Sequence, residues 1–331
     1  MAGLYTEDFV GRLQQGIGNK LEDWGLPPET TIKMLNVSEN ATFLAEDPFL
    51  GKRVIFRVHR PDYHTEQEIE SELKWISALQ QENVVHTAAP MPTIQGNLLH
   101  RIHDSEQERL IVAFEFVKGE EPAIHGDLVP WFEKLGEVTA RLHVHSRNWK
   151  RPEGFMRKYW NIDTMVTPEG YWGDWREAIG MDEAKIATIS DSIAIIRKRL
   201  DVYGQEADRY GLVHADLRLA NLLINGADLS VIDFDDTGFC WFAYDFAAAI
   251  SFHEFDPNIP SLQDAWIKGY RSVAPFSEED EAELPTFILL RRILLTAWLA
   301  SHAETPTGQE LGGSFTEGTV KIAETFIAAN Q

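Results

Sequence analysis

The chain has 331 residues, of which 44% are hydrophobic and 25% are charged, as in an ordinary globular protein of one large domain or two. Lys and Arg number 30 against 52 Asp and Glu, and the resulting net charge of -22 repels nucleic-acid backbones and anionic membrane surfaces. We therefore expect neither a nucleic acid nor a membrane as a partner.

The single cysteine, Cys240, leaves no internal disulfide to form, so nothing points to an oxidising compartment. The first residues lack the basic segment and apolar core of a secretory signal. The longest apolar stretch, 287–300, is interrupted by Arg291 and Arg292 and is too short to span a bilayer. These features predict a cytoplasmic protein.

The N-terminal part predicts one helix followed by three strands. Apolar residues recur at helical spacing over 6–24, and a Gly-Leu-Pro-Pro segment ends the pattern. Residues 31–35, 41–45 and 53–58 have the composition of strands separated by turns. Three early antiparallel strands indicate a small β-rich lobe.

The third strand carries a basic residue whose environment the pattern leaves open. Period-2 alternation places Arg57 on the same face as Ile55, which is typical of a solvated edge strand or of a buried charge with a partner. A helix over 66–79 follows, and Glu68 and Glu72 lie beside its apolar stripe. Either glutamate could form a bidentate pair with Arg57 and direct it at a phosphate.

Residues 110–117 read as a strand that enters a linker at Gly119, and the composition then becomes helical. We therefore place a lobe boundary at residue 117, with an N-terminal lobe over 1–117 and a helical C-terminal lobe over 118–331. The second lobe has six predicted helices, at 131–143, 182–203, 242–252, 262–273, 279–301 and 315–329. The fold class predicted is α+β with two lobes.

A predicted hairpin divides the second lobe. Two short apolar runs, 222–224 and 229–232, flank the turn sequence Asn-Gly-Ala-Asp at 225–228. Beside the hairpin lie three polar residues that its apolar context does not explain, Asp216, Asn221 and Asp233.

A base for an acceptor hydroxyl and two hard-oxygen ligands for Mg²⁺ are what phosphoryl transfer requires, and these three residue types supply them. The plain alternative is that they are turn and cap residues. A second alternative is a phosphatase in which Asp233, in the sequence Asp-Phe-Asp-Asp-Thr, takes the phosphoryl group covalently. That class needs acidic residues at later strand ends, whereas the chain beyond Thr237 reads mainly as helices.

Residues 214–221, His-Ala-Asp-Leu-Arg-Leu-Ala-Asn, followed by Ile-Asp-Phe-Asp at 232–235, resemble the catalytic and metal-binding segments of the aminoglycoside phosphotransferase and choline kinase family. Residues 38–43 and 56–60 resemble the nucleotide-covering hairpin and third strand of its homoserine-kinase-like branch. The resemblance extends over most of the chain and implies a protein-kinase-like fold.

The resemblance also implies roles in the second lobe. Asp216 would be the catalytic base, and Asn221 and Asp233 would be the Mg²⁺ ligands. Arg218 would neutralise the transferred γ-phosphoryl group, and Asp245 would brace the catalytic loop.

For the first lobe, the resemblance implies ATP as the cofactor beside Mg²⁺. Arg57 would contact the α- and β-phosphates and be held by Glu72, with Glu68 as the rival partner. Ser38 and Asn40 would belong to the nucleotide-covering loop, and the backbone from Glu115 to Val117 would meet the adenine. Arg57 stands where protein kinases usually have Lys, so we expect a working site with altered geometry.

The predicted function is ATP-dependent transfer of a phosphoryl group to a hydroxyl of a small molecule. Asp235, Asp236 and the negative charge of the chain favour a cationic acceptor, such as an amino alcohol or hydroxy amino acid of the homoserine, hydroxylysine or choline type. The competing functions are an aminoglycoside-inactivating phosphotransferase, a bacterial stress-type protein Ser/Thr kinase and a non-catalytic pseudokinase. The aromatic residues of 149–175 could bind a cation through ring faces, or pack between helices.

Overall fold

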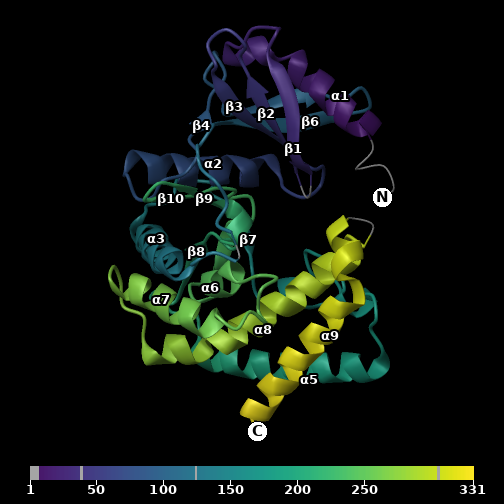
Figure 1. Cartoon of the computed structure of the whole chain (residues 1–331), viewed down its shortest axis with the longest axis vertical. Coiled ribbons are helices and arrows are strands. Elements are labelled where there is room, and N and C mark those ends of the chain that lie inside the picture. The colour runs from purple at the N-terminus through teal and green to yellow at the C-terminus, as the bar shows by residue number, and fades with distance from the viewer. Residues whose placement is uncertain (1–6, 38–39, 124, 304–305) are drawn as a thin grey trace. The chain divides into compact units, whose positions relative to one another are not determined.

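The computed structural model describes residues 7–37, 40–123, 125–303 and 306–331 (Figure 1). The chain forms two compact units. The N-terminal unit comprises 1–120, 150–157 and 223–235, and the C-terminal unit comprises 121–149, 158–222 and 236–331.

The N-terminal unit is built on an antiparallel sheet. Its strands are β1 (Thr31–Val37), β2 (Ala41–Glu46), β3 (Arg53–Val58), β4 (Pro90–Met91), β5 (Leu99–His103) and β6 (Glu108–Glu115). They are ordered β1-β2-β3-β6-β4, and β5 also pairs with β6. β3 is therefore an interior strand, hydrogen-bonded to β2 on one side and to β6 on the other.

The alternation along β3 separates two environments. Val54, Phe56 and Val58 join an apolar core with residues of α1 (Glu7–Gly18) and of the 3-10 helix η1 (Leu21–Trp24). Arg57 points from the opposite face toward α2 (Glu66–Gln81) and is 5% exposed. Because β3 is interior and Arg57 is buried, the solvated edge-strand interpretation is wrong.

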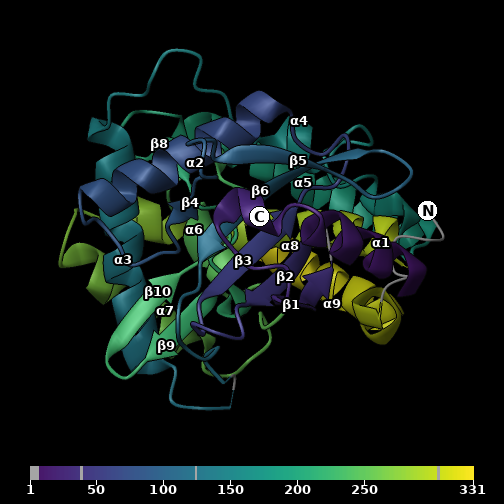
Figure 2. The ribbon, with the colours of Figure 1, turned by 90° about the horizontal axis from the view of Figure 1, so that it is seen from above.

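The hairpin of β9 (Leu222–Asn225) and β10 (Asp228–Val231), drawn in green in Figure 2, belongs mainly to the N-terminal unit, although the predicted boundary assigned it to the second lobe. Glu120 exchanges backbone hydrogen bonds with Ile224, at 3.0 and 2.8 Å. Gly119 permits this approach, because a Cβ on it would lie 2.8 Å from that of Leu223. The hairpin is thus tied to the linker by long-range pairing that local pattern does not reveal.

The C-terminal unit is mainly helical. Its helices are α3 (Val129–Asn148), α4 (Ile162–Met165), α5 (Glu183–Tyr203), α6 (Tyr244–Ala249), α7 (Ile259–Arg271), α8 (Glu278–Ser301) and α9 (Pro306–Ala329), with short 3-10 turns η2 (Trp175–Glu177) and η3 (Leu219–Asn221). A small sheet joins β7 (Lys158–Tyr159), β11 (Gly238–Trp241) and β8 (Tyr210–Val213). The α+β class is confirmed.

α8 is the central helix of this unit. It contacts α5, α6 and α9, and it lies beside α9 in both views (Figures 1 and 2). In the described part of the chain it is the one helix long and apolar enough to cross a membrane, and 72% of its most apolar window is buried. Burial on most sides explains why its sequence over 287–300 is apolar apart from Arg291 and Arg292.

α3 and α7 pack at unusually close range because each presents a glycine to the other. A Cβ on Gly136 of α3 would lie 2.0 Å from the carbonyl oxygen of Trp266, and one on Gly269 of α7 would lie 1.8 Å from that of Glu133. The backbones therefore touch directly, which no larger residue would permit.

Candidate active site

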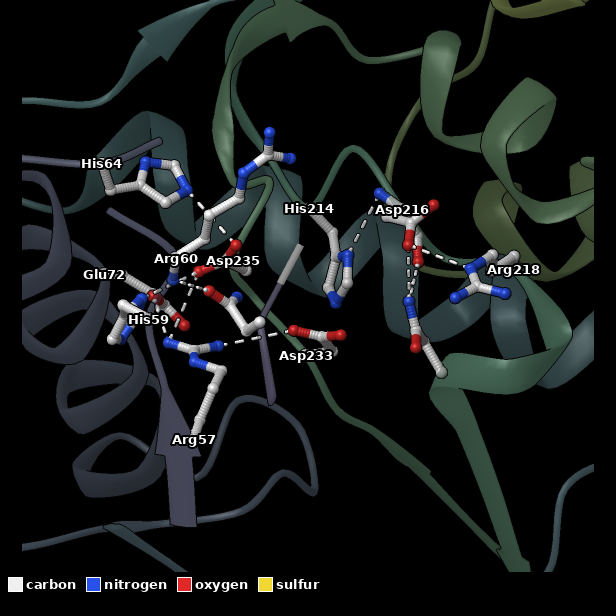
Figure 3. A network of polar contacts seen from close by, with 12 residues as sticks. Arg57, His59, Arg60, His64, Glu72, His214, Asp216, Arg218, Asp233 and Asp235 are labelled. Carbon is white, nitrogen blue, oxygen red and sulfur yellow. Dashed lines mark hydrogen bonds and ion pairs between the residues drawn. The ribbon is translucent and has the colours of Figure 1, made fainter. Parts of the chain in front are cut away.

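Arg57 is the centre of a buried charge cluster in the N-terminal unit (Figure 3). Its Nη2 lies 2.6 Å from Oε2 of Glu72, and its Nη1 lies 3.4 Å from Oδ1 of Asp233. Burial would lower the pKa of Arg57, but Glu72 and the two nearby aspartates, Asp235 and Asp233, more than offset this and raise it. Arg57 therefore stays a cation oriented by Glu72.

Glu68 has a different use. Its side chain accepts hydrogen bonds from the backbone N–H and hydroxyl of Thr65, and the Thr65 hydroxyl accepts from the backbone N–H of Glu68. This capping box fixes the start of α2. Of the two glutamates that the sequence left open, Glu72 is thus the partner of Arg57.

Asp235 is enclosed by basic side chains of the same unit. Its Oδ2 lies 3.3 Å from Nε2 of His64, its Oδ1 lies 3.7 Å from Nδ1 of His59, and its backbone carbonyl accepts a hydrogen bond from Arg157. Burial raises the pKa of Asp235, but His64 and Arg57 outweigh this and hold it well below its usual range. The carboxylate is buried among these partners, which offset its charge within the unit; that the acceptor is cationic stays a prediction.

Asp233 differs from Asp235 in being open to solvent. It follows β10, its φ is 64°, and its side chain is 46% exposed. A non-glycine residue at positive φ is uncommon and is found mostly where surrounding contacts impose it. The conformation leaves an accessible carboxylate beside Arg57.

Ala215, in the loop after β8, is also at positive φ, at 69°. Asp245, in the first turn of α6, holds this loop: its Oδ1 accepts the N–H of Ala215 at 2.8 Å, and its Oδ2 accepts that of His214 at 3.3 Å. His143 of α3 lies 3.0 Å from the same Oδ2 through its Nε2 and 3.0 Å from the hydroxyl of Tyr270 through its Nδ1. Asp245 therefore occupies the bracing position that the resemblance implied.

Asp216, the next residue, has both carboxylate oxygens engaged, and Figure 3 shows its contact with Arg218. Oδ2 accepts from Nδ2 of Asn221 at 2.7 Å and from Nε of Arg218 at 3.2 Å. Oδ1 accepts from Nη2 of Arg291 at 2.5 Å. Burial alone would raise the pKa of Asp216, but Arg218 and Arg291 lower it below its ordinary value. The group is a fixed, ionised carboxylate.

The chemistry of Asn221 and Asp233 fits a divalent cation. The amide nitrogen of Asn221 donates to the backbone carbonyl and to Oδ2 of Asp216, which leaves its amide oxygen as an acceptor. An amide oxygen and an exposed carboxylate are hard donors of the type that Mg²⁺ prefers. Across the described ranges, no three His, Cys, Asp or Glu residues group to hold a metal, and the ligand set predicted here includes an amide. Asn221 and Asp233 belong to different units, so their assignment as ligands stays a prediction.

The remaining predicted nucleotide residues lie in the N-terminal unit. Ser38 falls outside the described residues. Asn40 accepts the backbone N–H of Arg60 at 3.3 Å through its side chain. Glu115 ends β6, where its N–H donates to the carbonyl of Ala89, and Val117 follows in a segment without regular secondary structure.

The sequence did not identify Arg291, Arg157 or His64 as residues of these clusters. The sequence does contain a sign of Arg291, which interrupts the apolar stretch 287–300. A charged side chain on a buried helix needs a partner. The partner of Arg291 lies 75 positions away in the sequence and could not be read from spacing. Trp160, Trp172 and Trp175 are buried, so these members of the aromatic segment serve packing.

The chain matches one protein family and several known proteins. The model of the phosphotransferase enzyme family (APH) matches residues 32–283. A solved microcompartment-associated aminopropanol kinase is 38% identical with a TM-score of 0.87, and the match covers 95% of this chain and 97% of that one. The amicoumacin kinase of Bacillus subtilis is 25% identical over 244 residues, 68% of this chain and 67% of its own length.

A solved choline kinase from Cryptosporidium parvum is 16% identical with a TM-score of 0.64, and covers 95% of this chain and 96% of its own; this likeness concerns the fold. The predicted protein-kinase-like fold is confirmed, and the covalent phosphatase interpretation is wrong, since both the family and its fold belong to kinases. The chain is a kinase-type phosphotransferase and belongs to the phosphotransferase enzyme family.

Proposed function

We propose that the protein transfers the γ-phosphoryl group of ATP to the hydroxyl of a small amino alcohol. The observation that carries the proposal is the Asp216 carboxylate, which is ionised and held by three side chains beside a loop that Asp245 braces. A carboxylate fixed in this way suits the acceptor-orienting role in phosphoryl transfer.

In the proposed reaction, Asp216 accepts a hydrogen bond from the acceptor hydroxyl and receives its proton. The hydroxyl oxygen forms a bond to the γ-phosphorus while the bond to the bridging oxygen of ADP breaks. Arg218, one-third exposed, stands beside Asp216 to offset charge on the transferred group. Asn221 and Asp233 would hold Mg²⁺, which when bound offsets the charge of the phosphates.

Arg57 is the proposed ligand of the α- and β-phosphates. Its guanidinium is planar and has donors beyond those that contact Glu72 and Asp233, so it can bind a phosphate while it stays paired. Glu72, buried at 0% exposure, fixes its direction. ATP and a divalent cation are also supported by solved relatives, among them an amicoumacin kinase crystallised with AMP-PNP and Ca²⁺.

The acceptor class rests on two considerations. The aminopropanol kinase is the relative that shares 38% of residues over nearly the whole chain, and its named substrate is a small cationic amino alcohol. The net charge of -22 attracts cations to the protein as a whole. A second candidate is an antibiotic-modifying kinase, which the 25% identity to amicoumacin kinase favours. The absence of nucleic-acid and membrane partners and a cytoplasmic location remain part of the proposal.

The test is acceptor-dependent ADP release from Mg-ATP across matched panels of amino alcohols, hydroxy amino acids, aminoglycosides and amicoumacin-type compounds, with Asp216→Asn as the blank. We expect kcat/KM to be highest for a short amino alcohol, and mass spectrometry to find one added phosphoryl group on it. A highest kcat/KM for an antibiotic would replace the proposed acceptor with the second candidate. ADP release that no acceptor stimulates would contradict the proposal.

A protein kinase and a pseudokinase would each give a different result in the same assay. A protein kinase of the stress-response kind would transfer label from γ-labelled ATP to itself or to a protein, with no small acceptor required. A pseudokinase would bind AMP-PNP without any turnover of ATP. Labelled protein or binding without turnover would each exclude the small-molecule kinase.

A further inference from the structure

Arg291 is a buried cation on the apolar helix α8, and its guanidinium reaches the loop that carries Asp216. The side chain is 2% exposed in the C-terminal unit. Its donors contact four oxygens: Oδ1 of Asp216 at 2.5 Å, the carbonyl of Ala215 at 3.3 Å, the hydroxyl of Tyr244 at 3.2 Å and Oγ of Ser251 at 3.0 Å. One side chain thus links α8, α6, the segment after α6 and the catalytic loop.

The two oxygens of Asp216 are held from different sides. Arg291 binds Oδ1 and is almost fully buried, whereas Arg218, which binds Oδ2, has a side chain that is 33% exposed. The interior contact is also the shorter, at 2.5 Å against 3.2 Å. Oδ1 is therefore held from the interior, whereas Oδ2 is contacted by the partly exposed Arg218 and by Asn221.

Arg291 also restrains the backbone before Asp216. Ala215 is at positive φ, a conformation that is strained for an L-residue other than glycine. Asp245 accepts the N–H of this residue and Arg291 donates to its carbonyl, so the strained conformation is held from both ends. A guanidinium can reach a carboxylate, a carbonyl and two hydroxyls at once because its donors lie in a fixed plane, which the ammonium group of Lys cannot reproduce.

We propose that Arg291 is the positioning residue of the transfer step: from the buried side it fixes the rotamer of Asp216 and offsets its charge, so that Oδ2 faces the acceptor hydroxyl. The inference rests on the proposed role of Asp216 as the base. Arg291 would therefore affect kcat, through the position of Asp216, and would not affect nucleotide binding.

The chain offers a matched control in the next residue. Arg292 lies on the same helix, is 4% exposed, and also makes a buried ion pair, with Glu254. Its other hydrogen bonds go to the hydroxyl of Thr319 and the carbonyl of Phe315, both on α9, and its guanidinium also lies over the rings of Phe255 and Phe315. Replacing either arginine by Met removes a buried cation from α8, but of the two only Arg291 touches the loop of Asp216.

The experiment compares Arg291→Lys and Arg291→Met with Arg292→Lys and Arg292→Met. Thermal melts establish the temperature at which each variant is folded, AMP-PNP titration gives nucleotide affinity, and acceptor-dependent ADP release gives kcat and KM. We expect the Arg291 variants to lose about 10- to 10³-fold in kcat, because misplacing a reacting group by about 1 Å costs about 10²-fold. Nucleotide affinity should stay within about twofold, since the ATP-binding residues are untouched.

The Arg292 variants should lose as much thermal stability as the Arg291 variants, but their kcat should stay within about threefold of the wild-type value. Equal losses of kcat at positions 291 and 292 would show a structural role alone and overturn the inference. If Arg291→Met does not fold, Arg291→Lys decides, because it keeps the buried charge, and a wild-type kcat in it would equally overturn the inference. An active Asp216→Asn variant would instead refute the proposed base, so the two failures are distinguishable.

Discussion

Arg57 and Glu72 form an ion pair of 2.6 Å in which both side chains are buried, one on an interior strand and the other on α2. Removing one partner of a buried ion pair destabilises the fold, because the charge of the other partner is left buried and uncompensated. The pair also sets the direction of the guanidinium that we assign to the phosphates. Its removal should therefore lower both stability and nucleotide affinity.

Glu72→Gln tests this relationship. We expect it to lower the free energy of unfolding by about 3–5 kcal/mol, the usual cost of breaking a buried pair, and to raise the KM for ATP. Glu68→Gln on the same helix is the control, because Gln also serves at the third position of a capping box. Urea unfolding and ATP titration should separate the two variants, and equal effects would show that Glu72 has no special part.

Asp245→Asn tests the brace of the catalytic loop. The neutral amide would accept the N–H groups of His214 and Ala215 less strongly than the carboxylate does, so Asp216 would be less well placed. We expect kcat to fall about 10- to 100-fold at nearly unchanged nucleotide affinity. Asp264→Asn, on the exposed face of α7, should keep the wild-type kcat. Wild-type turnover in Asp245→Asn would contradict the bracing role.

His59 predicts a pH dependence of stability. Burial, and then the charge of Arg57, hold the pKa of His59 well below its ordinary value of 6.5. The unfolded chain therefore binds a proton at this residue first, and stability present above pH 6.5 is lost as the pH falls through and below that value. The slope from one such group is at most about 1.4 kcal/mol per pH unit.

Urea unfolding between pH 7.5 and 5 should show this loss, and His59→Gln should flatten the slope. His103→Gln, an exposed histidine of β5, is the control and should leave the slope as in the wild type. The same slope in His59→Gln as in the wild type would show that other groups carry the pH dependence.

The glycine contact between α3 and α7 predicts a difference between two Gly→Ala substitutions. Gly269→Ala places a methyl group 1.8 Å from the carbonyl of Glu133, so the helices must separate, at a cost of about 1–3 kcal/mol or more. Gly11→Ala on α1 meets open space and should stabilise by about 0.5–1 kcal/mol. Thermal melts measure both, and similar shifts for the two variants would show that the close approach is not needed.

Local pattern was sufficient for the parts of the fold that depend on periodicity. The alternation along β3 correctly placed Arg57 and Phe56 on opposite faces of the strand. The helical spacing over 66–79 and 182–203 predicted α2 and α5 to within a few residues. The short strands β5, β7, β8 and β11 were not predicted, because their few residues show little alternation and exist through pairing with distant chain.

The catalytic triplet Asp216, Asn221 and Asp233 was visible because its members lie at fixed spacings around one hairpin. Arg218 and Asn221, which also hold Asp216, were visible nearby, but Arg291 and His64 were not, since they lie 75 or more positions from Asp216 and Asp235 in the chain. Sequence also assigned Asp235 to the acceptor from its charge alone, and only burial reveals that this charge is already paired. Long-range partners are set by packing, which one sequence does not specify.

The central claim is that Asp216 is the base of an ATP-dependent transfer to a small hydroxyl compound, and Asp216→Asn tests it most directly. The measurement is acceptor-dependent ADP release by this variant and the wild type, with AMP-PNP affinity determined on the same samples. We predict a loss of about 10²- to 10⁴-fold in kcat, the usual contribution of a general base, with nucleotide affinity nearly unchanged. Undiminished turnover in Asp216→Asn would contradict the account.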